Sequence, residues 1–172
     1  MLERQVRLLQ SVCRCVSVAG PPEAHVGLDV PIIPDEVPGR GPLGAIYSGL
    51  AQTRSEYNLF LGCDLPFMEA HFLRWFAAQA LLYGVDATVP KGRDGRHPLC
   101  NVYRRRVLPV IRDRLACGQN AVRSLFSKVR CRVIPWTEIT RAGFSPRIFA
   151  NMNLPEDYEA AKRMLNGEWS LA

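Results

Sequence analysis

Tyr57-Asn-Leu-Phe-Leu-Gly-Cys-Asp64-Leu-Pro66 is a short apolar run that ends in an aspartate, a leucine and a proline. Its apolar centre predicts a buried β-strand that Pro66 stops. An aspartate directly after such a strand lies at the carboxyl edge of a sheet, where α/β proteins bind their ligands. It can hold a Mg²⁺ that bridges nucleotide phosphates, or it can cap the following turn or helix. Position alone leaves these two interpretations of Asp64 equally open.

Helical and strand patterns alternate on both sides of this segment. Apolar spacing predicts helices near 2–9, 43–52, 69–83, 107–115, 121–126 and 156–165, and strands at 15–18, 31–33, 57–62, 86–89, 99–103, 131–134 and 148–150. This order predicts one α/β domain over residues 1–172, with three layers and a mostly parallel sheet covered by helices on both faces. The two strands within 86–103 have no helix between them, which predicts a local antiparallel pair.

The net charge of +6 comes almost entirely from arginine, with three lysines against nineteen arginines. Arginine binds phosphate oxygens in a bidentate manner, so this composition gives weak support to a phosphate-bearing ligand. A codon bias across the genome is the more ordinary explanation. The basic residues are spread along the chain and form no aromatic-interleaved stripe, so we expect no nucleic acid partner.

Six cysteines are present, and none of them forms a C-x-x-C pair. Residues 1–10 alternate charged and apolar side chains, unlike a signal peptide. The chain has no apolar run long enough to span a membrane. We therefore expect free thiols, a cytoplasmic protein and no membrane partner.

Gly39-Arg-Gly-Pro-Leu-Gly44 matches G-x-G-x-x-G, and Asp64 lies twenty residues beyond it. The dinucleotide-binding fingerprint requires its glycines immediately after a strand, whereas five residues separate Ile33 from Gly39. A loop before a helix is the ordinary interpretation, and a Rossmann oxidoreductase remains a weaker hypothesis. In either case, a helix N-terminus at this loop could attract an anion.

Two further segments carry candidate binding residues. The polar loop 91–98 contains three basic side chains and His97, which suit an anionic substrate, although a solvated hairpin connection would look the same. After the predicted strand at 148–150 come Asn151 and Asn153, either of which could cap the next helix or reach a ligand.

These segments together resemble molybdenum cofactor guanylyltransferase, a family of nucleotidyltransferases with a nucleotide-diphospho-sugar-transferase-like variant of the Rossmann fold. The resemblance extends from Leu2 to about Met164. The motifs that carry it are Ile33-Pro-Asp35, Gly41-Pro-Leu-Gly-Ala-Ile46, Leu59-Phe-Leu-Gly-Cys-Asp64-Leu-Pro66, Arg96-His-Pro98, Gly118-Gln-Asn-Ala-Val-Arg-Ser-Leu125 and Phe149-Ala-Asn-Met-Asn153-Leu-Pro-Glu156.

The resemblance implies Mg²⁺-dependent transfer of GMP from GTP to molybdopterin cofactor, which gives molybdopterin guanine dinucleotide. It implies that Asp64 holds Mg²⁺, that Asp35 contacts the nucleotide, and that Arg96, His97, Asn151 and Asn153 face the pterin. Protein partners would be a molybdoenzyme or another cofactor-biosynthesis protein. The motifs do not distinguish GTP from CTP.

The family pattern opens with Leu-Ala-Gly-Gly-x-Ser-x-Arg-Met-Gly-x-Asp-Lys, a phosphate-binding loop, and Met1 matches a point inside the helix that follows it. We therefore expect an N-terminally truncated version of the fold that binds the nucleotide weakly. A start codon placed too late or a gene fragment would account for the truncation. A third hypothesis is a non-catalytic molybdopterin- or partner-binding protein that kept the fold after losing this loop.

Overall fold

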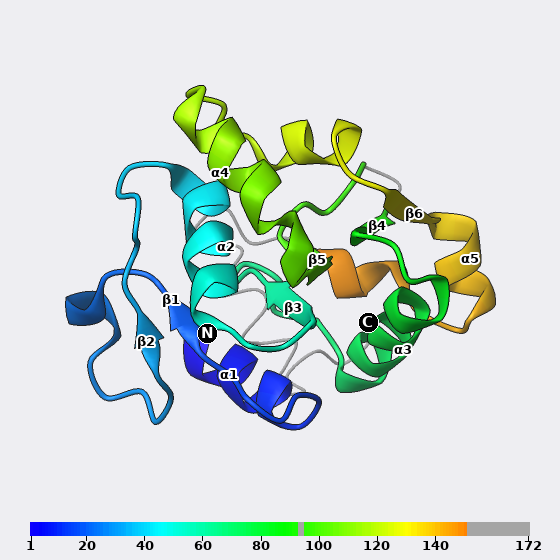
Figure 1. Ribbon diagram of the computed structural model, residues 1–172. Coiled ribbons are helices and arrows are strands. Elements are labelled where there is room, and N and C mark those ends of the chain that lie inside the picture. Colours follow the sequence, from blue (N-terminus) through cyan, green and yellow to red (C-terminus); the bar gives the residue numbers. More distant parts are fainter. Residues whose placement is uncertain (93–94, 151–172) are drawn as a thin grey trace.

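A four-stranded mixed sheet forms the centre of the computed structural model, which describes residues 1–92 and 95–150 (Figure 1). Its strand order is β3 (Tyr57–Leu61), β5 (Cys100–Arg104), β4 (Ala87–Lys91) and β6 (Cys131–Pro135). Strand β4 pairs in parallel with β6, and β5 is antiparallel to both β3 and β4. Consequently β3, β4 and β6 run in one direction, and their carboxyl ends share one edge of the sheet. The antiparallel pair that 86–103 predicts is confirmed.

A second, very small sheet precedes the main one. Strands β1 (Val18–Ala19) and β2 (Ile32–Ile33) pair in parallel over two residues each. Pro31 and Pro34 flank β2, and proline has no N–H to donate to a ladder, so the pairing stays short. The strand predicted at 15–18 therefore begins only at Val18.

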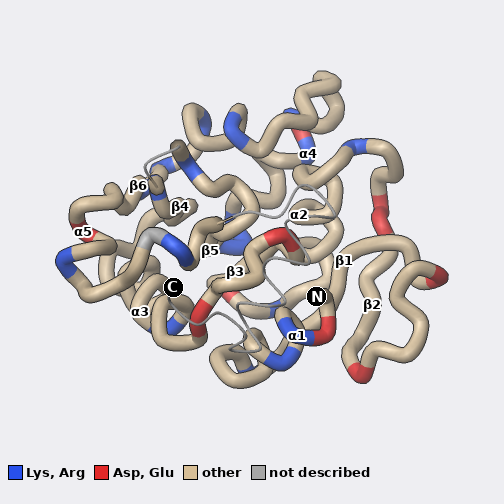
Figure 2. The backbone as a smooth tube through the Cα atoms, turned by 180° about the vertical axis from the view of Figure 1, so that it is seen from behind, with Lys and Arg blue, Asp and Glu red and all other residues tan. Residues whose placement is uncertain are grey.

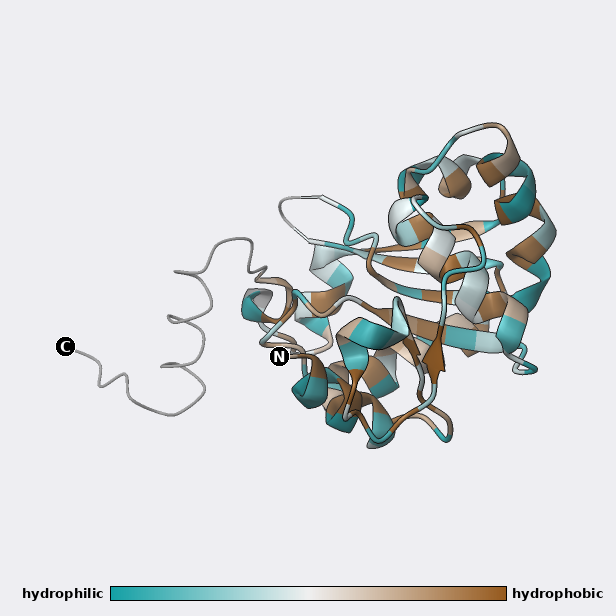
Figure 3. Ribbon diagram, turned by 90° about the vertical axis from the view of Figure 1, so that its left-hand side faces the viewer, coloured by the Kyte–Doolittle hydropathy of each residue, from teal (hydrophilic) through white to brown (hydrophobic). Residues whose placement is uncertain are grey.

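Helices cover both faces of the main sheet (Figure 3). One face packs against α1 (Leu2–Gln10), α3 (Ala70–Tyr83) and α5 (Trp136–Arg141). The other packs against α2 (Gly41–Gln52) and α4 (Leu108–Ala116). Four 3₁₀ helices complete the described elements: η1 (Pro22–His25), η2 (Arg105–Val107), η3 (Val122–Ser127) and η4 (Pro146–Phe149). The three-layer α/β prediction is confirmed.

The two apolar clusters follow the alternation of side chains along each strand. In β3, Leu59 and Leu61 pack toward α3, whereas Phe60 packs toward α2 and α4. In the cluster beside α3, Phe72 is fully buried, and its ring is 5.2 Å from that of Phe144. Aromatic contacts at this distance add specificity to apolar burial.

Two predictions in the C-terminal half need correction, and one short helix was not predicted. The sequence predicts a helix at 121–126 and a strand at 148–150, but η3 and η4 occupy these segments as 3₁₀ turns. In η4 the Ser145 hydroxyl accepts the Arg147 N–H, which favours a tight turn over an extended strand. Helix α5 has no counterpart among the predicted elements, because six residues are too few for helical periodicity to show. The helix predicted at 156–165 lies outside the described residues.

Candidate functional site

Asp64 follows β3 at the carboxyl edge of the main sheet, and it is half-buried. Its Oδ1 oxygen is buried and has no hydrogen-bond partner among the described residues. Helix α3 takes Glu69 as its N-cap and has no capping hydrogen bond from that side chain. Asp64 therefore does not cap the next helix, which was one of the two structural alternatives, a cap of the turn being the other.

Gly62 allows the Asp64 carboxylate to fold back against the strand. A Cβ added to Gly62 would lie 2.5 Å from Asp64 Oδ1 and 3.1 Å from Leu99 Cβ. The Gly62 N–H donates to the Leu99 carbonyl at 2.7 Å, so the backbone there is held as well. Any larger residue at this position would displace the carboxylate.

The carboxylate faces the first residue of β5. Leu61 pairs with Cys100 in the ladder between β3 and β5. Burial, and then the negative charge of Asp64, raise the pKa of the Cys100 thiol to about 12. The Cys100 thiol therefore stays neutral and brings no positive charge beside Asp64.

His97 reaches the same edge of the sheet through the connection from β4 to β5. The His97 backbone N–H donates to the Pro90 carbonyl, and the His97 backbone carbonyl accepts the Cys100 N–H, both at 3.1 Å. The imidazole stacks on Phe149, with ring centroids 4.3 Å apart and an interplanar angle of 9°. These contacts fix the position of the His97 ring.

Arg96 points to the opposite face of the sheet. Its guanidinium lies 5.6 Å from the centre of the Phe126 ring, beside α2 and α4 rather than α3. Burial raises the pKa of the Cys131 thiol, and the charge of Arg96 partly opposes this rise. Arg96 and His97 are thus adjacent in the backbone, but their side chains diverge.

Asp35 follows β2, in the small sheet rather than the main one. Its Oδ1 is also buried without a hydrogen-bond partner among the described residues. Ser48 of α2 anchors this loop by accepting the Glu36 N–H at 2.9 Å. Asp35 and Asp64 thus follow strands of two different sheets. Asn151 and Asn153, the remaining predicted site residues, lie outside the described part of the chain.

The donor set suits a cation that takes few protein ligands. No group of three or more His, Cys, Asp or Glu side chains with metal-binding geometry occurs in the described segments. Mg²⁺ commonly uses one or two carboxylates and completes its shell with water and substrate phosphates. The buried Oδ1 of Asp64, which has no hydrogen-bond partner among the described residues, suits this mode of coordination.

Sequence reasoning missed two supporting residues, Gly62 and Phe149. A glycine at the end of a strand and directly before Cys63-Asp64 was a usable signal for a close approach. Phe149 had no such signal, because its stacking on His97 depends on how η4 packs.

Basic residues lie on several elements rather than on one face (Figure 2).

No helix in residues 1–92 and 95–150 has both the length and the apolarity to cross a membrane.

The mixed sheet, with helices on both faces and a carboxylate beyond the end of β3, is the arrangement of an α/β protein that binds its ligand at the carboxyl edge of the sheet. Residues 1–133 match the family model described as the MobA-like NTP transferase domain, and this chain belongs to that family of transferase enzymes.

Related proteins cover most of the chain. A molybdenum cofactor guanylyltransferase from Desulfosudis oleivorans is 30% identical over 163 residues, which span 94% of this chain and 80% of that protein. A probable molybdenum cofactor guanylyltransferase from Methanothermobacter thermautotrophicus is 36% identical over 131 residues, or 74% of this chain and 64% of that protein.

A solved structure has the same fold at lower identity. A molybdopterin-guanine dinucleotide biosynthesis protein A from Archaeoglobus fulgidus superposes with a TM-score of 0.74 at 18% identity, over 85% of this chain and 73% of that one.

Proposed function

We propose that this chain transfers GMP from GTP to molybdopterin cofactor, with Asp64 as the protein ligand of a Mg²⁺ on the nucleotide phosphates. The observation that carries the proposal is the unpartnered Oδ1 of Asp64 at the carboxyl edge of the sheet. The names of the related guanylyltransferases supply the substrates. A nucleotidyltransferase role in molybdopterin guanine dinucleotide synthesis accounts for the unpartnered Asp64 oxygen and for the names of these relatives.

The transfer exchanges one phosphoanhydride bond for another. An oxygen of the molybdopterin terminal phosphate attacks the α-phosphorus of GTP, the bond to the β-phosphate breaks, and pyrophosphate leaves. Bound Mg²⁺ would neutralise charge on the phosphates. The protein has little covalent chemistry to perform, so its residues bind and orient the reactants.

The remaining site residues divide by position. Asp35 is assigned to the nucleotide, and the His97 ring, which Phe149 holds in place, is assigned to the pterin. Arg96 has the charge to contact the pterin phosphate once its guanidinium leaves Phe126. Asn151 and Asn153 are assigned to the pterin by family resemblance.

Asp64→Asn tests the proposal because it removes charge while preserving shape. We expect Mg²⁺·GTP affinity, measured by calorimetry, to fall at least about tenfold, a loss typical even of outer-shell changes at metal sites. Transfer of label from α-phosphate-labelled GTP to molybdopterin should fall with it. The unfolding free energy should stay the same or rise by about 1 kcal/mol, because an unpaired buried charge is removed.

Asp113→Asn is the matched control, since Asp113 lies on α4 with its side chain 73% exposed. It should change neither binding nor transfer. Unaltered Mg²⁺·GTP binding by Asp64→Asn would refute the assignment of Asp64.

A non-catalytic partner-binding role is the second candidate. The partial exposure of β3 and its position at the edge of the sheet favour this role. All five residues of β3 are only half-buried, although Leu59, Phe60 and Leu61 are apolar. Within the described residues, β3 pairs with β5 and with no other strand. Such an edge can accept a strand from another protein. Stable association in sedimentation, together with undetectable GTP binding, would favour this role over transfer.

A further inference from the structure

A pocket of about 490 Å³ lies at the end of the main sheet opposite Asp64. Its charged lining comes from segments that flank the strands: Asp86 precedes β4, Arg130 precedes β6, and Arg106 follows the antiparallel strand β5. All three therefore sit at the amino-terminal edge of the parallel strands, whereas Asp64 follows the carboxyl end of β3. The volume is within the range of small-molecule sites.

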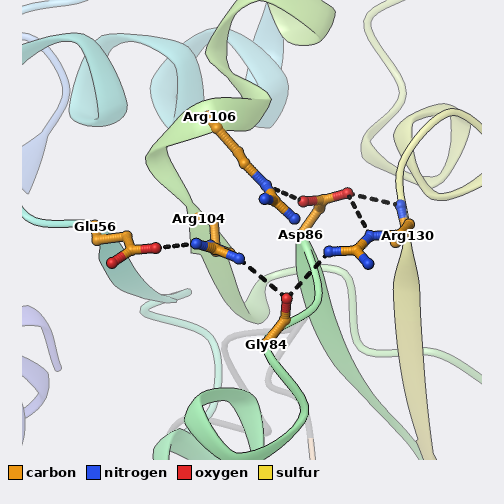
Figure 4. A network of polar contacts seen from close by, with 6 residues as sticks. All are labelled: Glu56, Gly84, Asp86, Arg104, Arg106 and Arg130. Carbon is orange, nitrogen blue, oxygen red and sulfur yellow. Dashed lines mark hydrogen bonds and ion pairs between the residues drawn. The ribbon is translucent and has the colours of Figure 1, made fainter.

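One carboxylate in this pocket organises two arginines (Figure 4). Asp86 Oδ1 accepts the Arg106 Nε–H, and Asp86 Oδ2 accepts the Arg130 backbone N–H at 3.0 Å. The Arg130 guanidinium lies beside the same oxygen, at 3.7 Å, and donates to the Gly84 carbonyl. The Asp86 side chain is only 15% exposed, so it faces its arginines more than solvent.

The pocket carries an excess of positive charge. Lys128 adds a third cation, and no ion pair or hydrogen bond of its ammonium group is recorded in the described part of the chain. Three cations against one carboxylate leave a net charge of +2 (3 − 1) among the lining residues. The side chains of Arg106 and Arg130 are 48% and 67% exposed, so their remaining N–H groups can reach a ligand.

Apolar residues at the start of α4 line another part of the pocket. Val107 is the N-cap of α4 and Val110 lies in its first turn, and both line the pocket. Together with Val129, these two valines form an apolar wall beside the cations.

We propose that this pocket binds a small phosphate-bearing molecule, with its phosphate held by Arg106, Lys128 and Arg130 and its less polar part against the valine wall. The site is separate from Asp64, so it is additional to the site of nucleotidyl transfer. Asp86 holds the two guanidiniums in place while they bind the phosphate. Charge-assisted and bidentate contacts of this kind are the strong class of hydrogen bond.

The test uses phenyl phosphate, which combines a phosphate with an apolar ring, on the full chain in EDTA to suppress metal-dependent binding at Asp64. Calorimetry should detect saturable binding, and phenol should not bind. Lys128→Gln and Arg106→Gln should each weaken phenyl phosphate binding about tenfold, the cost of one charge-assisted hydrogen bond. The Lys128 side chain makes no hydrogen bond or ion pair within residues 1–92 and 95–150, and its backbone N–H, which donates to the Leu125 carbonyl, is kept in Lys128→Gln, so this variant should fold normally.

Two control variants show whether phenyl phosphate binds in this pocket. Arg112→Gln removes an equal charge from the exposed outer side of α4, where Arg112 is 67% exposed, and should leave phenyl phosphate binding intact. Asp64→Asn should also leave it intact, so failure of the nucleotide site does not affect this test.

Three results would overturn the proposal. The first is absence of phenyl phosphate binding, and the second is an equal loss from Arg112→Gln. The third is binding of a hexaglutamate peptide more tightly than phenyl phosphate through the same arginines, since that would identify an acidic protein segment as the occupant.

Discussion

Gly62 shows how a residue without a side chain can position a functional one. The Asp64 carboxylate occupies the space that a Gly62 Cβ would need. A buried carboxylate oxygen without a partner costs stability in the absence of a ligand. Residues that carry such a cost are typically retained for binding or catalysis.

Gly62→Ala should therefore damage the site more than the fold. The new methyl group would push the Asp64 carboxylate from its place and press on Leu99, so Mg²⁺·GTP affinity should fall about tenfold. The unfolding free energy should fall by only about 1 kcal/mol, because the displaced atom is the end of a flexible side chain. Calorimetry and urea unfolding measure the two effects. A large loss of stability with intact nucleotide binding would contradict this assignment.

Cys63 and Cys100 flank Asp64 in space but differ in reactivity. Cys63 is exposed, whereas Cys100 is fully buried and its pKa is raised to about 12. At pH 8 iodoacetamide should label Cys63 and spare Cys100 until the protein is unfolded, since the thiolate is the reactive form. Mg²⁺·GTP should slow labelling of Cys63. Tryptic peptides 55–74 and 97–104 report the two cysteines separately by mass spectrometry, and rapid native labelling of Cys100 would contradict its burial.

At the scale of elements, Asp86 ties the start of β4 to the segments that flank β5 and β6. Burial tends to raise the pKa of this carboxyl, but the Arg130 N–H and the Arg106 guanidinium outweigh it, so the pKa lies below its ordinary value. A carboxyl with a lowered pKa in the folded state stabilises the fold above its unfolded pKa. That stability is lost as the pH falls through the folded pKa.

Asp86→Asn should reduce the unfolding free energy at pH 7 by about 1 to 3 kcal/mol, the usual value for hydrogen bonds to charged groups. The difference from the unmodified protein should stay constant down to about pH 5 and shrink below about pH 4, as the carboxyl protonates. Urea unfolding at pH 7, 5 and 3 measures it, with the exposed Asp113→Asn as the control. A difference that persists at the lowest pH would show that the charge of Asp86 is not its source.

At the scale of the whole molecule, one sheet joins two apolar clusters, so both should unfold together. Phe72→Ala would empty the centre of the α3 cluster and cost about 3 to 5 kcal/mol. Circular dichroism and tryptophan fluorescence should still give coincident transitions. Leu82→Ala is the control on the same helix, since Leu82 is 74% exposed and should lose less than about 0.5 kcal/mol. Two separate transitions would show that the faces fold independently.

Much of the fold could be predicted because its elements are long enough to show a period. Helix α3 has buried positions at helical spacing and ends at Gly84 in the left-handed conformation, as its sequence suggests. Short elements were harder to predict, because a segment of six residues or fewer shows no clear period. The elements η3, η4 and α5 are all this short. In such segments packing against the sheet decides the backbone conformation.

The sequence alone determined the α/β class, the position of Asp64 after a strand, and the family resemblance, because these depend on local order and spacing along the chain. Only the tertiary structure decided that Gly62 makes room for the carboxylate and that Arg96 and His97 diverge. It also brought Asp86, Arg106 and Arg130 into one pocket. Those outcomes depend on which strands pair, and strand pairing joins residues that are far apart in the chain.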